Sequence, residues 1–275
     1  MHGANFATLK DILSVGKIAP VKTLLILFLF LVALTGCYSR QRYHHFQTST
    51  PFPKDHYLVL GFLGGRESWN STREGVRRLA LELRELNLSH LHVETVENVR
   101  RDLALRFIEK GLDRNRDGKL QDHETASARV ILYGQSFGGA AVVKLARELK
   151  KRNIPVLLTV QIDSVGRNDD TIPDNVRFAA NLFQRNGRFI RGEPVIHAEN
   201  PAKTTILGNF EFDYRRKKID LSSVRWWKKI FRVDHTKMNL DPAVWSKVKE
   251  LILQHLAARR AGVPARQDPI SYPLL

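Results

Sequence analysis

Segments typical of buried strands alternate with segments typical of helices through the middle of this chain. The strand-like segments are residues 57–60, 90–96, 129–133 and 155–162, and the segments with helical spacing between them are residues 71–86, 98–111 and 138–151. An order of strand, helix, strand and helix predicts a parallel sheet that is covered on both faces. We therefore expect an α/β fold, a three-layer sandwich with a mostly parallel central sheet.

Weaker sequence patterns predict one helix start, the elements after residue 163 and the limits of the folded domain. Ser71 and Glu74 have the spacing of a capping box, which predicts the start of a helix there. After residue 163 the alternation weakens, and we expect a helix over 174–184, a strand over 204–214 and an amphipathic helix over 241–256. The chain is 275 residues long and 43% hydrophobic, enough for one sizeable core. We assign 57–257 to one domain and 258–275 to a flexible tail.

The N-terminal region contains an apolar run over residues 23–34, which ends in Leu34-Thr35-Gly36-Cys37. The run is short for a membrane span and has the length of a signal-peptide core. Its ending resembles the lipobox of bacterial lipoproteins, in which the cysteine carries the lipid. The resemblance implies a signal peptide over 1–36, lipidation of Cys37 and an exported, membrane-anchored protein of the cell envelope. An uncleaved anchor or a core helix is the alternative. We expect residues 37–56 to be a polar tether.

The charge of the chain bears on its partners. The formal net charge is +16, an excess that favours anionic partners such as lipid head groups or acidic substrates. The sequence carries no zinc-finger, RNA-recognition or helix-turn-helix signature, so we expect no nucleic-acid partner.

The mixed aromatic and basic stretch 225–229 is interpreted either as half-buried packing or as a lipid or acyl contact. Cys37 is the single cysteine, which excludes an intramolecular disulfide.

A glycine-flanked serine lies between a predicted strand and a predicted helix. The stretch Gly134-Gln135-Ser136-Phe137-Gly138 follows the strand over 129–133. A sharp strand-to-helix turn crowds the positions two residues before and after its centre, so glycine is needed there. Such a turn exposes the serine oxygen and places it near the positive end of the next helix, where an oxyanion is stabilised. Ser136 is therefore a candidate nucleophile.

Over residues 57–257 the chain resembles the α/β-hydrolase superfamily, its lipase and esterase branch in particular. A second glycine-rich loop, 60–65, follows the first predicted strand, as in lipases. The resemblance implies that the backbone amides of Phe62 and Phe137 hold the oxyanion. Leu60 stands where such lipases usually have histidine. An ordinary glycine-rich turn is the alternative interpretation of this loop.

A serine nucleophile needs a base, and hydrolases of this type supply a histidine after the acid in chain order. His235 lies just before the last predicted helix, where the resemblance places the histidine. His255 lies within that helix, and His197 comes early in the chain. We favour His235 as the base.

The acid has several candidates. Asp163 directly follows the apolar strand next to the nucleophile, as in some lipases. Asp213 or Asp220 would serve if the acid came one strand later, as in most members of the superfamily. Asp234 is adjacent to the histidine in sequence and is poorly placed to orient it. We favour Asp163 as the acid. The alternative interpretation is that Asp163 caps the turn that follows the strand.

Residues 113–124 match the pattern of an EF-hand calcium loop. Oxygen-bearing side chains recur at Asp113, Asn115 and Asp117, a backbone carbonyl is available at Lys119, and Glu124 closes the loop. A solvated turn is the alternative. We expect a structural Ca²⁺ that braces the strand before Ser136.

These expectations combine into a serine hydrolase, an esterase, lipase or thioesterase that cleaves an acyl ester or a lipid substrate. Acyl transfer to another alcohol is a close variant, and a peptidase is a weaker one. The alternative of a different class is a non-catalytic, calcium-braced lipoprotein that binds an anionic envelope component. The oligomeric state is left open by the sequence.

Overall fold

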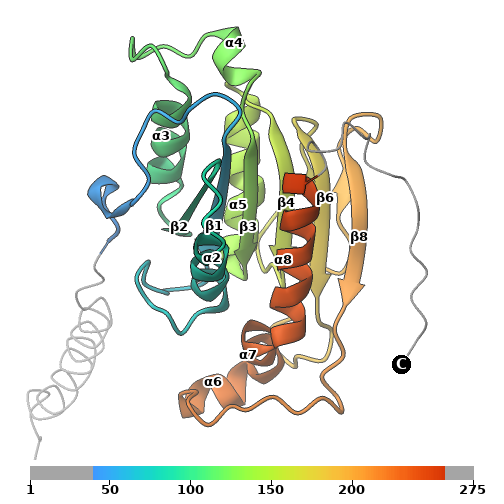
Figure 1. Cartoon of the computed structure of the whole chain (residues 1–275). Coiled ribbons are helices and arrows are strands. Elements are labelled where there is room, and N and C mark those ends of the chain that lie inside the picture. The colour runs from blue at the N-terminus through green and yellow to red at the C-terminus, as the bar shows by residue number, and fades with distance from the viewer. Residues whose placement is uncertain (1–39, 258–275) are drawn as a thin grey trace, which may run out of the picture. The chain divides into compact units, whose positions relative to one another are not determined.

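A six-stranded sheet forms the centre of the protein, whose computed structural model describes residues 40–257. Every strand pair in this sheet is parallel, and the strand order is β2-β1-β3-β4-β6-β8 (Figure 1). The strands are β1 (Tyr57–Leu63), β2 (Leu91–Glu97), β3 (Val130–Gln135), β4 (Val156–Ile162), β6 (Val176–Phe183) and β8 (Thr205–Glu211). Two short strands, β5 (Thr171–Ile172) and β7 (His197–Ala198), pair separately. The predicted α/β class is confirmed.

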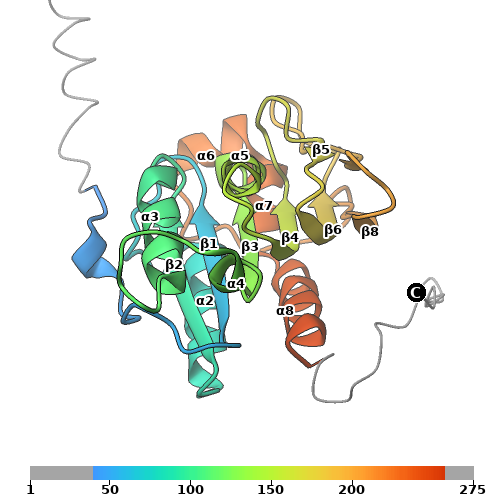
Figure 2. The same cartoon turned by 90° about the horizontal axis from the view of Figure 1, so that it is seen from above.

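Helices cover both faces of the sheet, which gives three layers (Figure 2). Helices α3 (Arg101–Leu112) and α5 (Phe137–Lys150) pack on one face, and α2 (Gly75–Glu85) and α8 (Pro242–Ala257) pack on the other. The shorter helices are η1 (Tyr43–His45), α4 (Asp122–Thr125), α6 (Trp226–Phe231) and α7 (Val233–Leu240). Among these described helices, none combines the length and apolar character that a membrane crossing requires.

Strand β1 shows how the sequence builds two cores. Its side chains are buried along the whole strand, because the strand is central and both faces are covered. Leu58, Leu60 and Phe62 point into the core under α3 and α5, whereas Tyr57 and Val59 point into the core under α2 and α8. Successive side chains point to opposite faces, and both faces are apolar cores. The segment is therefore apolar at nearly every position.

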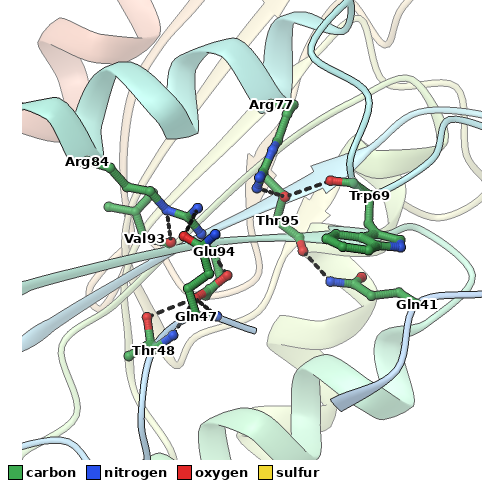
Figure 3. A network of polar contacts seen from close by, with 9 residues as sticks. All are labelled: Gln41, Gln47, Thr48, Trp69, Arg77, Arg84, Val93, Glu94 and Thr95. Atoms are coloured by element: carbon green, nitrogen blue, oxygen red, sulfur yellow. Dashed lines mark hydrogen bonds and ion pairs between the residues drawn. The ribbon is translucent and has the colours of Figure 1, made fainter. Parts of the chain in front are cut away.

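The segment before β1 packs on the domain, so the prediction of a free tether is wrong for residues 40–56. Glu94 on β2 accepts hydrogen bonds from the backbone amides of Gln47 and Thr48, each at 2.8 Å, and Arg84 donates to the same carboxylate (Figure 3). Gln41 is buried and donates to the backbone of β2 at 2.8 Å. These polar groups of the segment are hydrogen-bonded to the domain.

Phe52 adds an apolar anchor to the same segment. Its ring belongs to the core under α3, and a Cβ on Gly111 would lie 1.9 Å from it. Glycine on α3 therefore makes room for the ring. The residues before Arg40, with the predicted signal peptide and Cys37, lie outside the described part of the chain, as does the predicted tail 258–275.

Three local predictions differ from the structure. Residues 174–184 were predicted as a helix but contain the strand β6, which lies between β4 and β8 and has buried residues over most of its length. The predicted capping box is absent, since Glu74 is the N-cap of α2 and makes no side-chain cap hydrogen bond. His235 lies within α7, a short helix that the sequence pattern did not predict.

Candidate active site

Ser136 occupies a strained turn between β3 and α5. Its backbone angles are φ 58° and ψ −125°, a combination that residues other than glycine rarely adopt. Its amide donates to the carbonyl of Ile162 at 2.9 Å, and its carbonyl accepts from the amide of Val165 at 3.4 Å. These two bonds fix the turn against the end of β4 and the residues that follow Asp163.

The flanking glycines are required by close backbone contacts. A Cβ on Gly138 would lie 2.1 Å from the carbonyl oxygen of Phe62, and a Cβ on Gly134 would lie 2.4 Å from the carbonyl oxygen of Gly138. Real Cβ atoms do not approach backbone atoms this closely, because the repulsion is prohibitive. The turn at Ser136 is therefore possible only with glycine at both positions.

His235 and Asp163 form a buried hydrogen-bonded pair. His235 Nδ1 lies 2.5 Å from Asp163 Oδ2, and the two side chains come from residues 72 positions apart in the chain. Asp163 directly follows β4, and the register pairs Ile162 with Gln135, the residue before Ser136. The exposed fractions of Ser136, Asp163 and His235 are 7%, 0% and 6%. The serine and the pair thus share the carboxyl edge of the sheet in a site largely closed to water.

Gln184 holds the carboxylate of Asp163 in place. Its backbone amide donates to Asp163 Oδ1 at 3.2 Å, and its side-chain Nε2 donates to Oδ2 at 3.0 Å. The same Nε2 donates to the carbonyl of Ile190, and its Oε1 accepts from the amide of Gly187. The orientation of the Gln184 side-chain amide is thus fixed by three contacts, and Gln184 presents only donors to Asp163.

The loop over 187–192 lies against Asp163 and Gln184. A Cβ on Gly192 would lie 2.2 Å from Asp163 Oδ1, so glycine is needed for this close approach. Neither Gln184 nor Gly192 was predicted as a site residue from the sequence. A glutamine at the end of an apolar strand is a weak signal, and the contacts join segments that are distant in the chain.

The other candidate acids and bases lie elsewhere. Asp213 and Asp220 are exposed and accept hydrogen bonds from Arg215 and Ser222 in their own turns. Asp234 pairs with Lys237 at 2.9 Å. Two other histidines also lie elsewhere. His197 is exposed on β7, and His255 donates from Nδ1 to the carbonyl of Leu251 in its own helix.

The candidate oxyanion donors differ in position. Phe137 is the first residue of α5, and the first amides of a helix have no partner within it. Phe62 lies inside β1, which continues to Leu63, and has register partners on both neighbouring strands. Phe62 is therefore a strand residue, whereas the sequence pattern placed it in the loop that follows the strand. The first loop residue after β1 is Gly64, and a Cβ there would lie 3.3 Å from Ser136 Cβ.

The predicted calcium loop contains the turn that the pattern requires. Asp113 accepts hydrogen bonds from the amides of Asp117 at 3.1 Å and Gly118 at 3.0 Å, and Gly118 has φ 76°. Glu124 is directed to the loop backbone, where its two oxygens accept from the amides of Arg114 and Gln121.

Across residues 40–257 no group of three or more His, Cys, Asp and Glu side chains is arranged to hold a metal ion. An EF-hand loop also uses asparagine and backbone carbonyl oxygens, here Asn115 and Lys119, which that grouping leaves out. The calcium site therefore stays a prediction.

The chain matches no protein-family model and no curated protein. Among solved structures, its backbone is similar to that of a cutinase-like protein from Cryptococcus sp., with a TM-score of 0.42 and 15% identity over 76% of this chain and 98% of that chain. It is also similar to Est1E from Butyrivibrio proteoclasticus, with a TM-score of 0.37 and 11% identity over 74% of this chain and 90% of that chain. At this degree of likeness, function has to be argued from the residues of the site.

Proposed function

We propose that the chain is a serine hydrolase that cleaves an ester or thioester, with Ser136 as nucleophile, His235 as base and Asp163 as the orienting acid. One observation carries the proposal: the strained serine turn lies at the same sheet edge as the buried 2.5 Å bond between His235 and Asp163. Backbone strain of this kind persists where the surrounding structure enforces it, which is typical of functional sites.

The hydrogen bond to Asp163 assigns a role to each imidazole nitrogen. With Nδ1–H donated to the carboxylate, Nε2 is the unprotonated nitrogen, and it takes the proton from the Ser136 hydroxyl. The serine oxygen then attacks the acyl carbonyl, and the imidazolium returns the proton to the leaving group. Water repeats the sequence on the acyl-enzyme and releases the acid.

Two backbone amides would hold the oxyanion. Phe137 supplies the amide at the N-terminus of α5, where the helix dipole adds to the stabilisation. Gly64 is the second donor, because it is the loop residue that lies against Ser136. Gly64 thus replaces Phe62 in the assignment made from the sequence.

Hydrolysis of p-nitrophenyl esters of increasing chain length tests the proposal. Wild type should turn over at least one of them, and Ser136→Ala should lose about 10⁶-fold in kcat, as removal of a serine nucleophile does. The matched control is Ser89→Ala, at an exposed serine in the turn between α2 and β2. Equal activity of Ser136→Ala and wild type would refute the proposal, and absence of any turnover would favour a binding protein.

We also propose a lipid on Cys37, supported by the sequence alone. Because Gln41 is fixed on β2, Cys37 precedes the first anchored residue by four positions, and a chain of four residues spans at most roughly 14 Å. A lipid there would hold the domain close to the bilayer. Wild type should partition into detergent after Triton X-114 phase separation, and Cys37→Ser should stay in the aqueous phase. Equal partitioning of the two proteins would refute the anchor.

The calcium loop is proposed as a structural brace of β3. Isothermal titration calorimetry should detect one Ca²⁺ per chain, with binding lost in Asp113→Ala and kept in Asp122→Ala, which removes an exposed carboxylate from the same loop. Absence of heat in wild type at millimolar Ca²⁺ would refute the site.

A further inference from the structure

Glu67 folds back on the loop that follows β1. Its backbone amide donates to the carbonyl of Gly64 at 3.0 Å, which closes a four-residue turn. The amide of Gly64 in return donates to Glu67 Oε2 at 2.8 Å. The proposed oxyanion donor is therefore already bonded to a carboxyl oxygen.

That oxygen and the Ser136 side chain both lie against Gly64. A Cβ placed on Gly64 would be 3.4 Å from Glu67 Oε2 and 3.3 Å from Ser136 Cβ, so both atoms surround the same point. An oxyanion hole works when its donors lie 2.7–3.1 Å from the oxyanion oxygen, as a general rule. Glu67 Oε2 lies within this distance of the Gly64 amide, so the amide is occupied and has to leave Glu67 before it can donate to an oxyanion.

Charged groups from three elements face Glu67. Glu74, the N-cap of α2, is hydrogen-bonded to it, and burial together with Glu74 raises the pKa of Glu67 well above its ordinary value. Lys228 on α6 and the Gly64 amide act in the opposite direction. Arg232, directly before α7, interacts electrostatically with both carboxyl groups.

The same cluster is tied to the helix that carries the proposed base. Asn239 on α7 donates from Nδ2 to Glu74 Oε2 at 2.8 Å, and its Oδ1 accepts from the amide of Gly75 at 2.9 Å. Asn239 lies one helical turn after His235. The position of the two carboxyl groups is thus set by the active-site framework and not by solvent.

We propose that Glu67 opens and closes the oxyanion hole: its carboxyl group holds the Gly64 amide in the substrate-free enzyme and releases it to the substrate oxygen during the reaction. This inference rests on the proposed hydrolase function. Neutral Glu67 is a weak acceptor and is easily displaced, whereas ionised Glu67 binds the amide more strongly and repels the developing oxyanion.

The protonation of Glu67 then sets an alkaline limit to activity. Because its pKa is raised, the carboxyl group stays neutral above the ordinary range and ionises as the pH rises through the raised value. Activity should fall across that step. The fall should be on the order of tenfold, since a hydrogen bond to a charged acceptor exceeds a neutral one by about that factor in equilibrium constant.

The test compares kcat/KM between pH 5 and pH 9 for wild type, Glu67→Gln and Glu74→Gln. Glu67→Gln keeps the size and an acceptor oxygen but cannot ionise, so the alkaline fall should disappear and its activity at high pH should exceed that of wild type about tenfold. Glu74→Gln removes the like charge, so the fall should move to lower pH. Glu85→Gln, at an exposed carboxylate at the end of α2, should have the wild-type profile.

Fluorophosphonate labelling of Ser136 in each variant separates the possible failures. If the variants are labelled but Glu67→Gln keeps the wild-type pH profile, or loses activity equally at all pH values, the proposal for Glu67 is wrong. If wild type itself is not labelled at Ser136, the hydrolase function fails and the proposal falls with it. Opposite effects of the Glu67 and Glu74 variants would not arise from a purely structural role.

Discussion

Replacing Asp163 with asparagine removes one charge and one acceptor oxygen from a carboxylate whose two oxygens both accept hydrogen bonds. Asp163 is fully buried and receives donors from His235 Nδ1, the Gln184 amide and Gln184 Nε2. Asparagine offers one oxygen and one NH₂ group. In one orientation the NH₂ group faces Gln184 Nε2, and in the other it faces the Gln184 backbone amide. Gln184 cannot rotate to relieve this, because Ile190 and Gly187 fix its amide group.

Two effects of different size follow from Asp163→Asn. The donor–donor contact costs about 1–3 kcal/mol of unfolding free energy, the cost of an unsatisfied buried group. This lowers Tm by roughly 3–9 °C in a domain of about 200 residues. With the NH₂ group toward His235, the imidazole is held with its proton on Nε2, so it cannot accept the proton of Ser136. The loss in kcat should then be about 10⁴-fold, as for an orienting aspartate in a serine triad.

Burst-phase kinetics with a p-nitrophenyl ester, together with thermal unfolding, measures both effects. Asp213→Asn and Asp220→Asn are the matched controls, since these exposed carboxylates are bonded within their own turns. Each control should stay within about twofold of wild type, as expected for a surface substitution. An Asp163→Asn enzyme that acylates at more than a tenth of the wild-type rate would refute the assignment of the acid.

Other predictions test the turn, the N-terminal segment and the surface charges. Gly138→Ala should abolish fluorophosphonate labelling and cost about 1–3 kcal/mol of stability, because the new methyl would meet the Phe62 carbonyl at 2.1 Å; normal labelling would contradict this. Phe52→Ala should lower the urea unfolding free energy by about 3–5 kcal/mol, whereas Val99→Ala, at an exposed side chain, should change it by less than about 0.5. Equal stability of the two variants would mean that the N-terminal segment is loose. Lys150 and Lys203 lower the pKa of Asp174 from its ordinary 3.8 to about 2, so its stabilising effect is present above pH 3.8 and is lost as the pH falls through 2. Asp174→Asn should flatten this acid limb of the stability curve, and an unchanged limb would contradict the ion pairs.

The sequence predicts those parts of the site that depend on local pattern. Ser136 is found because its two glycines and the change from strand to helix period lie within a few residues. Asp163 is found because it ends an apolar strand, although Asp213 and Asp220 could be excluded only by seeing their partners. Phe62 was assigned to a loop because the glycine at 61 suggested that β1 had ended. The ring of Tyr133 instead occupies the space beside Gly61, and the strand continues to Leu63.

The rest depends on contacts between distant segments. Gln184 and Gly192 matter because they contact Asp163, and Glu67 matters because it bonds to the loop beside Ser136. Strand β6 was predicted as a helix, and it is a strand because it pairs with β4 and β8 on its two sides, which the local pattern does not show. Residues 40–56 were predicted as a tether because they are polar, but their polar groups bond to β2.

Peptide mapping of the fluorophosphonate adduct is the most direct measurement of the central claim. The wild-type protein should carry one adduct, located by mass spectrometry on Ser136, and should carry none after unfolding in urea. An adduct on a different residue of the folded protein, or equal labelling of folded and unfolded protein, would contradict the account.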